Sequence, residues 1–531
     1  MTVAAATGRS RAVNPIFVLL TGSIGCAMTV LDTNVVGIVL PTIARDLGAR
    51  FADIEWVISS YVLCFASLLL PAGTIADRLG RRRVFLGGIA FFGLASVLCG
   101  LAPTAIDLSV ARALQGIGAA FLLAPALAII GHAFHGESER NHAWAIWGGM
   151  MGLTMALAPI IGGVIAFALG WRWAFFINAP ICLVLGFCVL FLIEESRDPE
   201  VGRPDPFGIV LFALTMFGLT AGLISGQDRG WTSFGALSGF GIGLCALVAF
   251  IGIEGAQSRP MLDLRLFRVP RFVGAALAMF SYAACAQVMA SLLPQFLQNG
   301  QGRTPLAAGF AMLPFALAML VFPYVGRRLG RRISATRLLV SGLSVVALGN
   351  VITGLGAYFE MGLVTAAGML VLGAGGGLLN GETQKAVMGS LPRDRAGMAS
   401  GISTTARFSG VLLGFAILSG VLSTATHAGL SRMKGFAPEF SDAVTSGDMT
   451  SALAGLSPAA RAATLSKAQL AYSHGFALAL AAAAIGAGVA AIVIQTLMRE
   501  QCEGADALRR GGSLQISGES RTPPFAGEPD A

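Results

Sequence analysis

Charged residues are scarce in this sequence: Asp, Glu, Lys and Arg make up 12% of its 531 residues, whereas soluble domains carry about 25%. Hydrophobic residues make up 55%, and the mean hydropathy is +0.75. This composition excludes an ordinary soluble enzyme and places most of the chain in lipid. The net charge of +8 does not indicate nucleic acid, because the basic residues fall in short loops between apolar runs.

Lysine is nearly absent. Lys385, Lys434 and Lys467 are the only three, and none follows a glycine, so the phosphate-binding pattern G-x-x-x-x-G-K-[ST] does not occur. An ATP-driven pump would therefore need another subunit to supply the ATPase. No nucleophile elbow, H-E-x-x-H or dinucleotide fingerprint lies where its chemistry would work. We expect a protein that is not an enzyme and that needs no cofactor.

Cysteine pairs at metal or redox spacing are also missing. None of the eight cysteines forms a C-x-x-C motif, and seven lie in or beside apolar runs, so no disulfide framework is indicated. A histidine cluster follows the fourth apolar run, but its spacing fits no standard metal site on a helix. We interpret the cluster as a solvated loop and expect no metal. Its members are His132, His135 and His142, with Glu137 and Glu139.

Fourteen apolar runs are long enough to cross a bilayer, which takes about 20 residues. Arg9 and Arg11 precede the first run as in a signal peptide, but the run continues to Pro41, so we expect an uncleaved span. The predicted spans lie near 16–41, 54–76, 84–102, 105–131, 143–168, 174–193, 207–225, 233–253, 272–298, 305–325, 335–357, 362–387, 396–422 and 473–498.

An even number of spans places both termini on one side, and the excess of arginine on that side predicts the cytoplasm. Similar basic turns at 80–83 and 330–332, each after the second span of its region, indicate an internal repeat. Repeated six-span halves are typical of secondary transporters, whose binding site lies between them. We predict a cytoplasmic N-terminus (1–15), two six-helix bundles (16–193 and 272–498), linkers with two additional spans (194–271), an outer loop (423–472) and a disordered cytoplasmic tail (499–531).

Residues 73–83, GTIADRLGRRR, place one acid among four arginines after the second span. They match the major facilitator loop signature G-x-[LI]-x-D-R-x-G-R-[KR]. An Asp at a span end can pair with basic side chains and with a helix N-terminus of the other half, forming a lock that breaks as the halves rock. The alternative is a simple positive anchor. We assign gating to Gly73, Asp77, Arg78, Gly80 and Arg81; the copy at 326–332 lacks the Asp.

Three more segments resemble the major facilitator superfamily and, within it, the 14-span drug:proton antiporters. Residues 31–41, LDTNVVGIVLP, are similar to L-D-x-T-[IV]-V-N-[VI]-A-L-P, and residues 112–120, RALQGIGAA, to R-x-x-Q-G-x-G-A-A. Residues 171–180, WRWAFFINAP, also look like this subfamily. The resemblance implies an all-α integral membrane protein with the major facilitator fold, two six-helix bundles and two extra helices.

The fifth span carries GLTMALAPIIGG at 152–163, close to the antiporter signature G-x(5)-G-P-x-x-G-G, with Ala158 in place of a glycine. A proline and two glycines in one place favour a bend at which the protein opens. We therefore assign conformational gating to Gly152, Pro159, Gly162 and Gly163.

Charged residues inside a membrane are costly and usually mark an ion or substrate path. Asp32 lies nine residues before Pro41, about 13 Å from the outer end of its span, and Arg112 lies seven residues after Ala105, about 10 Å from the same face. Because their depths are similar, we hypothesise that they are paired and carry proton coupling, a role that the resemblance also implies. The alternatives are a snorkelling acid and an arginine that donates to backbone carbonyls.

In the second half the candidates for a substrate cavity are Gln287, Glu382 and Arg407. Arg407 lies eleven residues into its span, about 16 Å deep and near the midplane. Glu382 and Lys385 are three residues apart and can instead neutralise each other on one helix face. Gln287 supplies a neutral hydrogen-bonding group, although such residues more often pack between helices.

These observations predict a proton-coupled exporter of small amphipathic molecules in the cytoplasmic membrane, working by alternating access. The alternatives are an exporter of one endogenous metabolite and a non-transporting receptor or membrane enzyme of the same fold. The expected partners are a small-molecule substrate, protons and the lipid bilayer, not nucleic acid. We expect a monomer and leave open an envelope partner.

Overall fold

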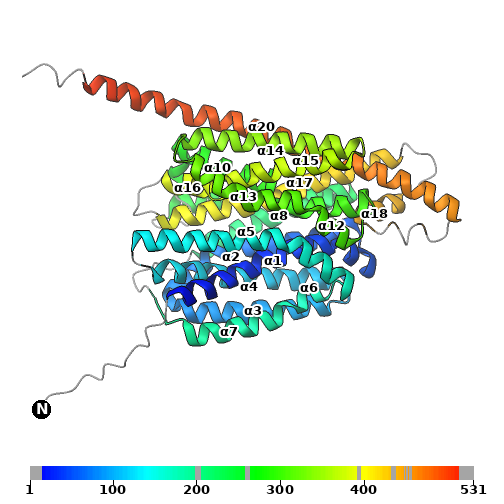
Figure 1. Cartoon of the computed structure of the whole chain (residues 1–531), viewed down its shortest axis with the longest axis horizontal. Helices are drawn as coiled ribbons and strands as arrows, with labels where there is room; N and C mark the ends of the chain where they lie inside the picture. Colours follow the sequence, from blue (N-terminus) through cyan, green and yellow to red (C-terminus); the bar gives the residue numbers. More distant parts are fainter. Residues whose placement is uncertain are drawn as a thin grey trace, which may run out of the picture.

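The computed structural model describes residues 15–134, 136–197, 205–257, 264–390, 396–431, 438–447, 449, 453 and 457–513. Within these residues every regular element is a helix (Figure 1). Fourteen helical stretches are long and apolar enough to cross a membrane, judged by length and composition. The prediction of an all-α membrane protein with fourteen spans is confirmed.

The first half comprises the helices up to residue 192. Within it α1 packs against α4 and α5, α2 packs against α4, and α3 packs against α4 and α7. A short loop divides the sixth span into α6 and α7, so that seven helices make six spans. The helices are α1 (Pro15–Leu47), α2 (Phe51–Leu79), α3 (Arg81–Leu101), α4 (Ala105–Ala133), α5 (Glu137–Ala168), α6 (Trp173–Phe176) and α7 (Asn178–Leu192).

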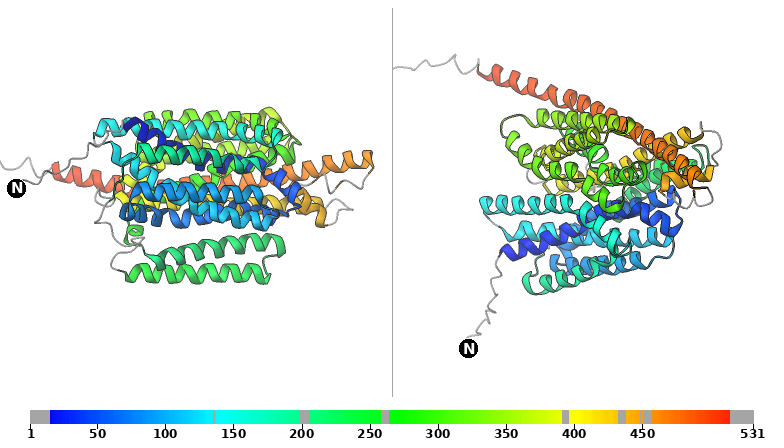
Figure 2. Two further views of the ribbon diagram at one scale, coloured as in Figure 1. Left: turned by 90° about the horizontal axis from the view of Figure 1, so that it is seen from below. Right: turned by 45° about the vertical axis from the view of Figure 1, so that its right-hand side comes forward.

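Two additional helices, α8 (Pro206–Arg229) and α9 (Phe234–Ala256), form a hairpin beside the two halves (Figure 2). Glycines bring them together: a Cβ built on Gly243 would meet the backbone nitrogen of Leu219 at 2.8 Å, and one built on Gly239 would meet the Cα of Gly222 at 2.7 Å. Such close backbone contact replaces the hydrophobic effect as the source of association in lipid. The pair also contacts both halves, through α2 and α17.

The second half begins with the 3₁₀ turn η1 (Leu264–Arg268), and its first span contains two π-helical turns. The elements of that span are α10 (Pro270–Tyr282), η2 (Ala283–Gln287), α11 (Met289–Gln295) and η3 (Phe296–Gly300). The remaining helices are α12 (Pro305–Ala311), α13 (Leu313–Leu329), α14 (Ala335–Tyr358), α15 (Gly362–Leu379), α16 (Glu382–Gly389), α17 (Ala396–Ser431), α18 (Pro438–Ser446) and α20 (Pro458–Ser513). Figure 2 shows the two halves as separate layers.

The last helix differs from the prediction at both ends. The expected outer loop 423–472 is shortened because α17 continues to Ser431 and α20 begins at Pro458; α18 lies between them. At the other end α20 continues to Ser513. The expectation of a disordered tail from residue 499 is therefore wrong for residues 499–513. Residues 499–510 are rich in the good helix formers Glu, Gln, Ala, Leu and Arg and contain no proline. Residues 514–531 lie outside the described residues.

The bundle has two distinct ends. We call basic end the one at which α2 and α13 finish, with Arg81, Arg82 and Arg83 after α2 and Arg327, Arg328, Arg331 and Arg332 at and after α13. We call distal end the opposite one, at which α1 and α17 finish. In Figure 1 the basic end, with α16, is on the left, and the distal end, with α18, is on the right.

Candidate functional site

An ion pair lies at the centre of the first half. Arg112 Nη1 on α4 donates to Asp32 Oδ2 on α1 at 2.6 Å. The side chains of Arg112 and Asp32 are 1% and 0% exposed, so neither reaches solvent at a membrane surface. The structure therefore brings together the two residues assigned to proton coupling. A fully buried pair is strongly coupled, because removing one partner leaves the other charge uncompensated.

Two amides complete the surroundings of the Asp32 carboxylate. Gln115 Nε2 donates to Asp32 Oδ1 at 2.8 Å, and Asn178 Nδ2 on α7 donates to the same oxygen at 2.9 Å. Both amides also reach Ser96 Oγ on α3, at 2.8 Å from Gln115 and 3.4 Å from Asn178. The carboxylate thus accepts three hydrogen bonds, which involve both of its oxygens.

The arginine is held from several sides as well. Arg112 Nη1 donates to Gln115 Oε1 at 2.6 Å, and Arg112 Nε donates to the backbone carbonyl of Val57 on α2 at 3.2 Å. Its guanidinium carbon lies 4.0 Å from the ring centroid of Tyr61 and 5.9 Å from that of Phe175. An arginine over an aromatic face gains cation–π stabilisation, which is largest when the pair is desolvated.

The local sequence of α4 explains this geometry. Arg112 and Gln115 are three residues apart and so share one helix face. Gly116 allows α4 to lie directly against α2, since a Cβ at this position would collide with the carbonyl oxygen of Tyr61. Gly118 likewise faces the backbone of Phe92 on α3, with 2.7 Å between a built Cβ and the Phe92 Cα. The motif RALQGIGAA therefore supplies both the charge and the close packing that buries it.

The arginines that follow α2 have partners in α2, at the end of α7 and just after it. Arg81 Nε donates to Asp77 Oδ1 at 2.7 Å, and Arg83 Nε lies 3.6 Å from Glu195 Oε2. Arg82 Nη2 donates to the backbone carbonyl of Leu190 at 2.6 Å. Gly80 has φ +117°, a conformation that favours glycine, and its Cα lies against the carboxylate of Glu195. Asp77 thus pairs with a basic side chain of its own turn, as the first part of the prediction had it. The contact with a helix N-terminus of the other half, and the gating role, stay predictions.

The glycines of α5 lie where the two halves meet. A Cβ on Gly163 would meet the carbonyl oxygen of Pro305 on α12 at 2.8 Å, and one on Gly152 would meet Leu320 Cδ1 on α13 at 3.2 Å. Gly162 faces α1 instead, with Val35 Cα at 3.2 Å. Although it contains Pro159, α5 is one continuous helix. The structure therefore places these residues at helix contacts; their gating role stays a prediction.

Two of the three second-half candidates come together. Arg407 Nε on α17 donates to Gln287 Oε1 in the π turn η2 at 2.9 Å, and the Arg407 guanidinium carbon lies 5.9 Å from the ring centroid of Tyr282. The third lies elsewhere: Glu382 is 8% exposed at the start of α16 and pairs with Lys385 Nζ at 3.3 Å. The alternative of a mutually neutralised Glu382–Lys385 pair is therefore the one the geometry favours.

A buried acid at the distal end was not among the predicted site residues. Glu55 on α2 is 1% exposed, and Ser419 Oγ on α17 donates to its Oε1, so the contact joins the two halves. Its second oxygen, Oε2, has no hydrogen-bond partner among the described residues. Further hydrogen bonds close the same end: Gln298 Nε2 donates to the Ile38 carbonyl at 2.8 Å, and Gln227 Nε2 to the Ala416 carbonyl at 2.9 Å.

Sequence reasoning also missed neutral groups of the network. Asn178 and Gln115 lie inside segments singled out for their resemblance, yet no role was assigned to them, and Ser96 was overlooked. The pattern that could have identified these residues is a polar side chain in an apolar run, at the same depth in the membrane as Asp32. Glu55 gave a weaker signal, because it lies four residues after the start of α2 and has the sequence position of an interfacial acid.

Two six-span layers with charged and polar side chains buried between membrane-spanning helices define a secondary transporter of the major facilitator type. Residues 22–415 match the family model of the Major Facilitator Superfamily, and the chain belongs to this family. The family predicted from the motifs is confirmed.

Relatives of this chain are bacterial drug-efflux proteins. It is 34% identical to the multidrug resistance protein Stp of Mycobacterium tuberculosis (strain CDC 1551 / Oshkosh) over 76% of this chain and 75% of that protein. It is 31% identical to the multidrug efflux pump LfrA of Mycolicibacterium smegmatis, over 88% and 93% of the two chains. The tetracenomycin C resistance and export protein of Streptomyces glaucescens is 33% identical over 76% of this chain and 75% of its own.

Solved structures share the fold. A bacterial homologue of the human lysosomal transporter Spinster, in an inward-facing and occupied conformation, has a TM-score of 0.65 and 17% sequence identity, over 91% of this chain and 97% of that one. At this identity the likeness supports the fold and nothing about the substrate.

Proposed function

We propose that this protein exports small amphipathic drugs or toxic compounds across the cytoplasmic membrane in exchange for protons. The observation that carries the proposal is the buried Asp32–Arg112 pair, because a titratable pair sealed inside lipid is costly unless it has a function. Drug and antibiotic export by relatives that align over three quarters of the chain supports the substrate class.

Proton binding at Asp32 would change the packing of the first half. When the carboxylate is charged, Arg112, Gln115 and Asn178 all donate to it. A proton on Asp32 removes the negative charge, and Arg112 remains as a buried cation with only dipoles around it. Breaking a buried pair in this way costs about 3–5 kcal/mol, so Arg112 moves to other partners. Because it also holds the Val57 carbonyl and the Tyr61 ring, its movement is transmitted to α2.

The second half would supply the substrate-facing groups. Arg407 and Gln287 lie together on α17 and η2, and among the described residues the guanidinium donates one hydrogen bond, from Nε to Gln287. A cation at this position disfavours dications, so neutral and singly charged amphipathic compounds are the expected substrates. Glu382 is tied to Lys385 and is the weaker candidate for a cavity residue.

Orientation follows from the arginines. Because loops rich in Lys and Arg remain in the cytoplasm, we place the basic end and both termini there. The hydrogen-bonded distal end then faces outward, and this structure corresponds to a state closed to the outside. We further propose that the monomer is the transporting unit.

The test is substrate-induced proton release from everted membrane vesicles, with a panel of lipophilic cations. We expect release in the parent, loss of release in Asp32→Asn and strong reduction in Arg112→Ala. Asp107→Asn is the matched control, because Asp107 begins the same helix as Arg112 but is exposed and lies at the distal end. Unchanged release in Asp32→Asn would remove the coupling assignment. No release in the parent with any compound would favour an exporter of one metabolite or a receptor.

A further inference from the structure

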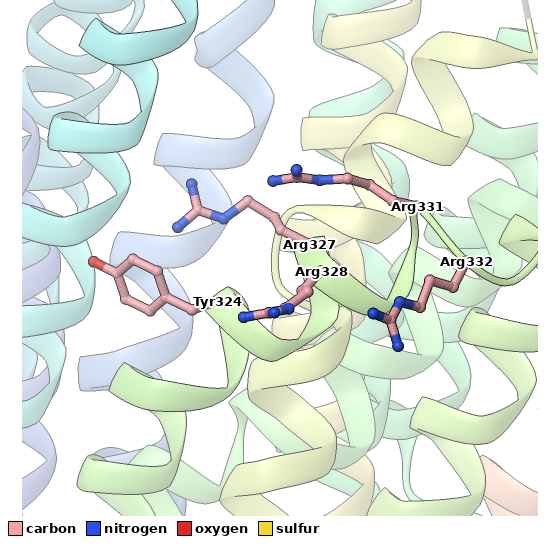
Figure 3. Close-up of a pocket in the computed structure, with 5 residues that line it drawn as sticks. All are labelled: Tyr324, Arg327, Arg328, Arg331 and Arg332. Carbon is pink, nitrogen blue, oxygen red and sulfur yellow. The ribbon is translucent and has the colours of Figure 1, made fainter.

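A pocket at the basic end has an unusual lining. It has a volume of about 580 Å³ and is formed by one aromatic residue and four arginines: Tyr324, Arg327, Arg328, Arg331 and Arg332. Figure 3 shows the four arginine side chains distributed around the turn that ends α13, with Arg327 on the side of Tyr324 and Arg332 away from it. Pockets of about 300–1,000 Å³ are the size that small ligands occupy.

The charges of this pocket are not balanced by acidic groups of the described residues. In the part of the chain that the structure describes, none of the four arginines forms an ion pair, and Arg327 stacks on Tyr324 at 4.7 Å from the ring centroid. Among the described residues that line the pocket, none is acidic. Glu382 lies beneath the turn, 3.0 Å from a Cβ built on Gly330, but its partner is Lys385.

The lack of ion pairs described for these arginines is not shared by the matching turn of the first half. There Asp77, Glu195 and the Leu190 carbonyl hold the arginines that follow α2. The second turn, at 326–332, lacks the Asp and keeps its arginines. A positive-inside anchor needs only charge, whereas four guanidinium groups converging around a cavity also repel one another unless an anion lies between them.

The helix below the pocket identifies the kind of anion. Leu317, Val321 and Tyr324 follow one another at spacings of four and three residues on α13, and they are 49%, 52% and 54% exposed. Residues at these spacings share one helix face, so an exposed apolar stripe leads directly to the arginines. The position of the stripe also involves the other half, because the Tyr324 hydroxyl lies against Gly149 of α5.

We propose that this pocket binds the phosphate headgroup of an anionic phospholipid, whose acyl chain lies on the stripe formed by Leu317, Val321 and Tyr324. Guanidinium groups bind phosphate oxygens through paired, charge-assisted hydrogen bonds. Basic residues at a membrane surface attract anionic lipids, and Tyr324 has the interfacial position that aromatic residues favour. Since the pocket opens beside the α5–α13 contact, bound lipid stabilises the arrangement of the two halves seen here.

The experiment measures lipid retained by the purified full chain in detergent, by native mass spectrometry, with added phosphatidylglycerol or phosphatidylcholine. We expect the parent to retain phosphatidylglycerol with at least about tenfold preference, and Arg327→Gln with Arg331→Gln to lose that preference. The matched control is Arg268→Gln with Arg337→Gln, which removes two exposed arginines of the basic end outside the pocket. Unchanged thermal unfolding of both double variants shows that they are folded.

Three results would overturn the proposal. If the pocket double variant retains phosphatidylglycerol as the parent does, the arginines do not form the site. If the control double variant loses as much lipid, the attraction is a general effect of charge at the basic end. If inorganic phosphate binds to the parent but phosphatidylglycerol does not, the pocket recognises a soluble phosphate and not a lipid.

Discussion

The two halves of this transporter treat a buried arginine in opposite ways. In the first half Arg112 faces a carboxylate, an amide, a carbonyl and an aromatic ring, and its side chain is 1% exposed. In the second half Arg407 is half-buried and donates to a neutral partner, Gln287. The first arrangement is a buried ion pair, whose proposed role is proton coupling. In the second, no acidic side chain of the described residues pairs with Arg407.

If the protein exchanges protons for drugs as proposed, this difference places proton coupling and substrate contact in different halves. The pair proposed to carry proton coupling, its two amides and the Ser96 hydroxyl all belong to helices of the first half, α1, α4, α7 and α3. The arginine proposed to face substrate belongs to α17, which also carries Ser419, the partner of Glu55. Coupling between the tasks must therefore cross the contact between the halves. We therefore expect measurable effects at the Asp32–Arg112 pair, at the contact between α5 and α12, at Arg407 and at the distal end.

The largest effect is expected at the compensated pair. Arg112→Met leaves the Asp32 carboxylate buried with two neutral donors and should destabilise the protein by about 3–5 kcal/mol. The double variant Asp32→Asn with Arg112→Met removes both charges and should lose less than the sum of the two single losses. Denaturant titration in micelles measures the three free energies of unfolding. Additive losses would show that the two side chains do not interact.

A smaller effect is expected where the halves touch. Gly163→Ala places a methyl group 2.8 Å from the Pro305 carbonyl oxygen, a backbone atom, and should cost about 1–3 kcal/mol. Gly148→Ala is the control on the same helix, because a Cβ there meets nothing within 4 Å, and alanine is the better helix former. Thermal unfolding compares the two. Equal behaviour of both variants would contradict the close approach of α5 and α12.

The uncompensated arginine should affect selectivity more than stability. Arg407→Gln removes a positive charge beside Gln287 and should shift relative transport toward dications by roughly tenfold, equivalent to about 1.4 kcal/mol, while proton release by the parent's substrates persists. Arg303→Gln, at an exposed position of the distal end, is the control. Competition between a monocation and a dication in vesicles measures the ratio. A ratio equal to that of the parent would place Arg407 away from the substrate.

The smallest effect is expected at the distal end, where Glu55 contacts Ser419. Glu55→Gln leaves a side chain that can hydrogen-bond with Ser419, whereas Glu55→Ala removes it. Loss of this hydrogen bond should destabilise the closed distal end by about 1 kcal/mol, which shifts the opening equilibrium roughly fivefold. The measurement is the thiol labelling rate of Ser423→Cys, one turn further along α17, in a background without the native cysteines. Faster labelling in Glu55→Ala than in Glu55→Gln is expected. Equal rates in both variants and the parent would show that this contact does not hold the end closed.

The sequence was most informative where a residue was chemically out of place. Asp32 and Arg112 are charges in apolar runs, and helix geometry alone put them at similar depths. The number of spans followed from hydropathy for the same reason. Neutral groups such as Asn178 carry no comparable mark, and only packing shows which of them reach the carboxylate. The start of α20 was missed because Arg461 and Lys467 lower the hydropathy of a segment that is nonetheless helical.

The spacing of glycines predicts close helix packing but does not show which glycine instead ends a helix. Gly373, Gly377 and Gly381 recur every four residues, which predicts close helix packing. Gly373 and Gly377 do pack closely against α13, whereas Gly381 has φ +90° and meets nothing within 4 Å. It separates α15 from α16 and so lets Glu382 begin a new helix. The backbone angle that distinguishes the two uses is fixed by the fold and leaves no trace in the spacing.

The π turn η2 has a consequence for how this site can vary. A π turn is a helical turn widened by one residue, so η2 holds one residue more than a regular α-helical turn would need. Gln287, the partner of Arg407, closes that turn. Each residue of an α-helix advances the chain by about 100°, so deleting one residue from 283–287 would redirect the amide without any change of side chain. The length of the chain at this point, as much as its chemistry, selects the group that meets the arginine.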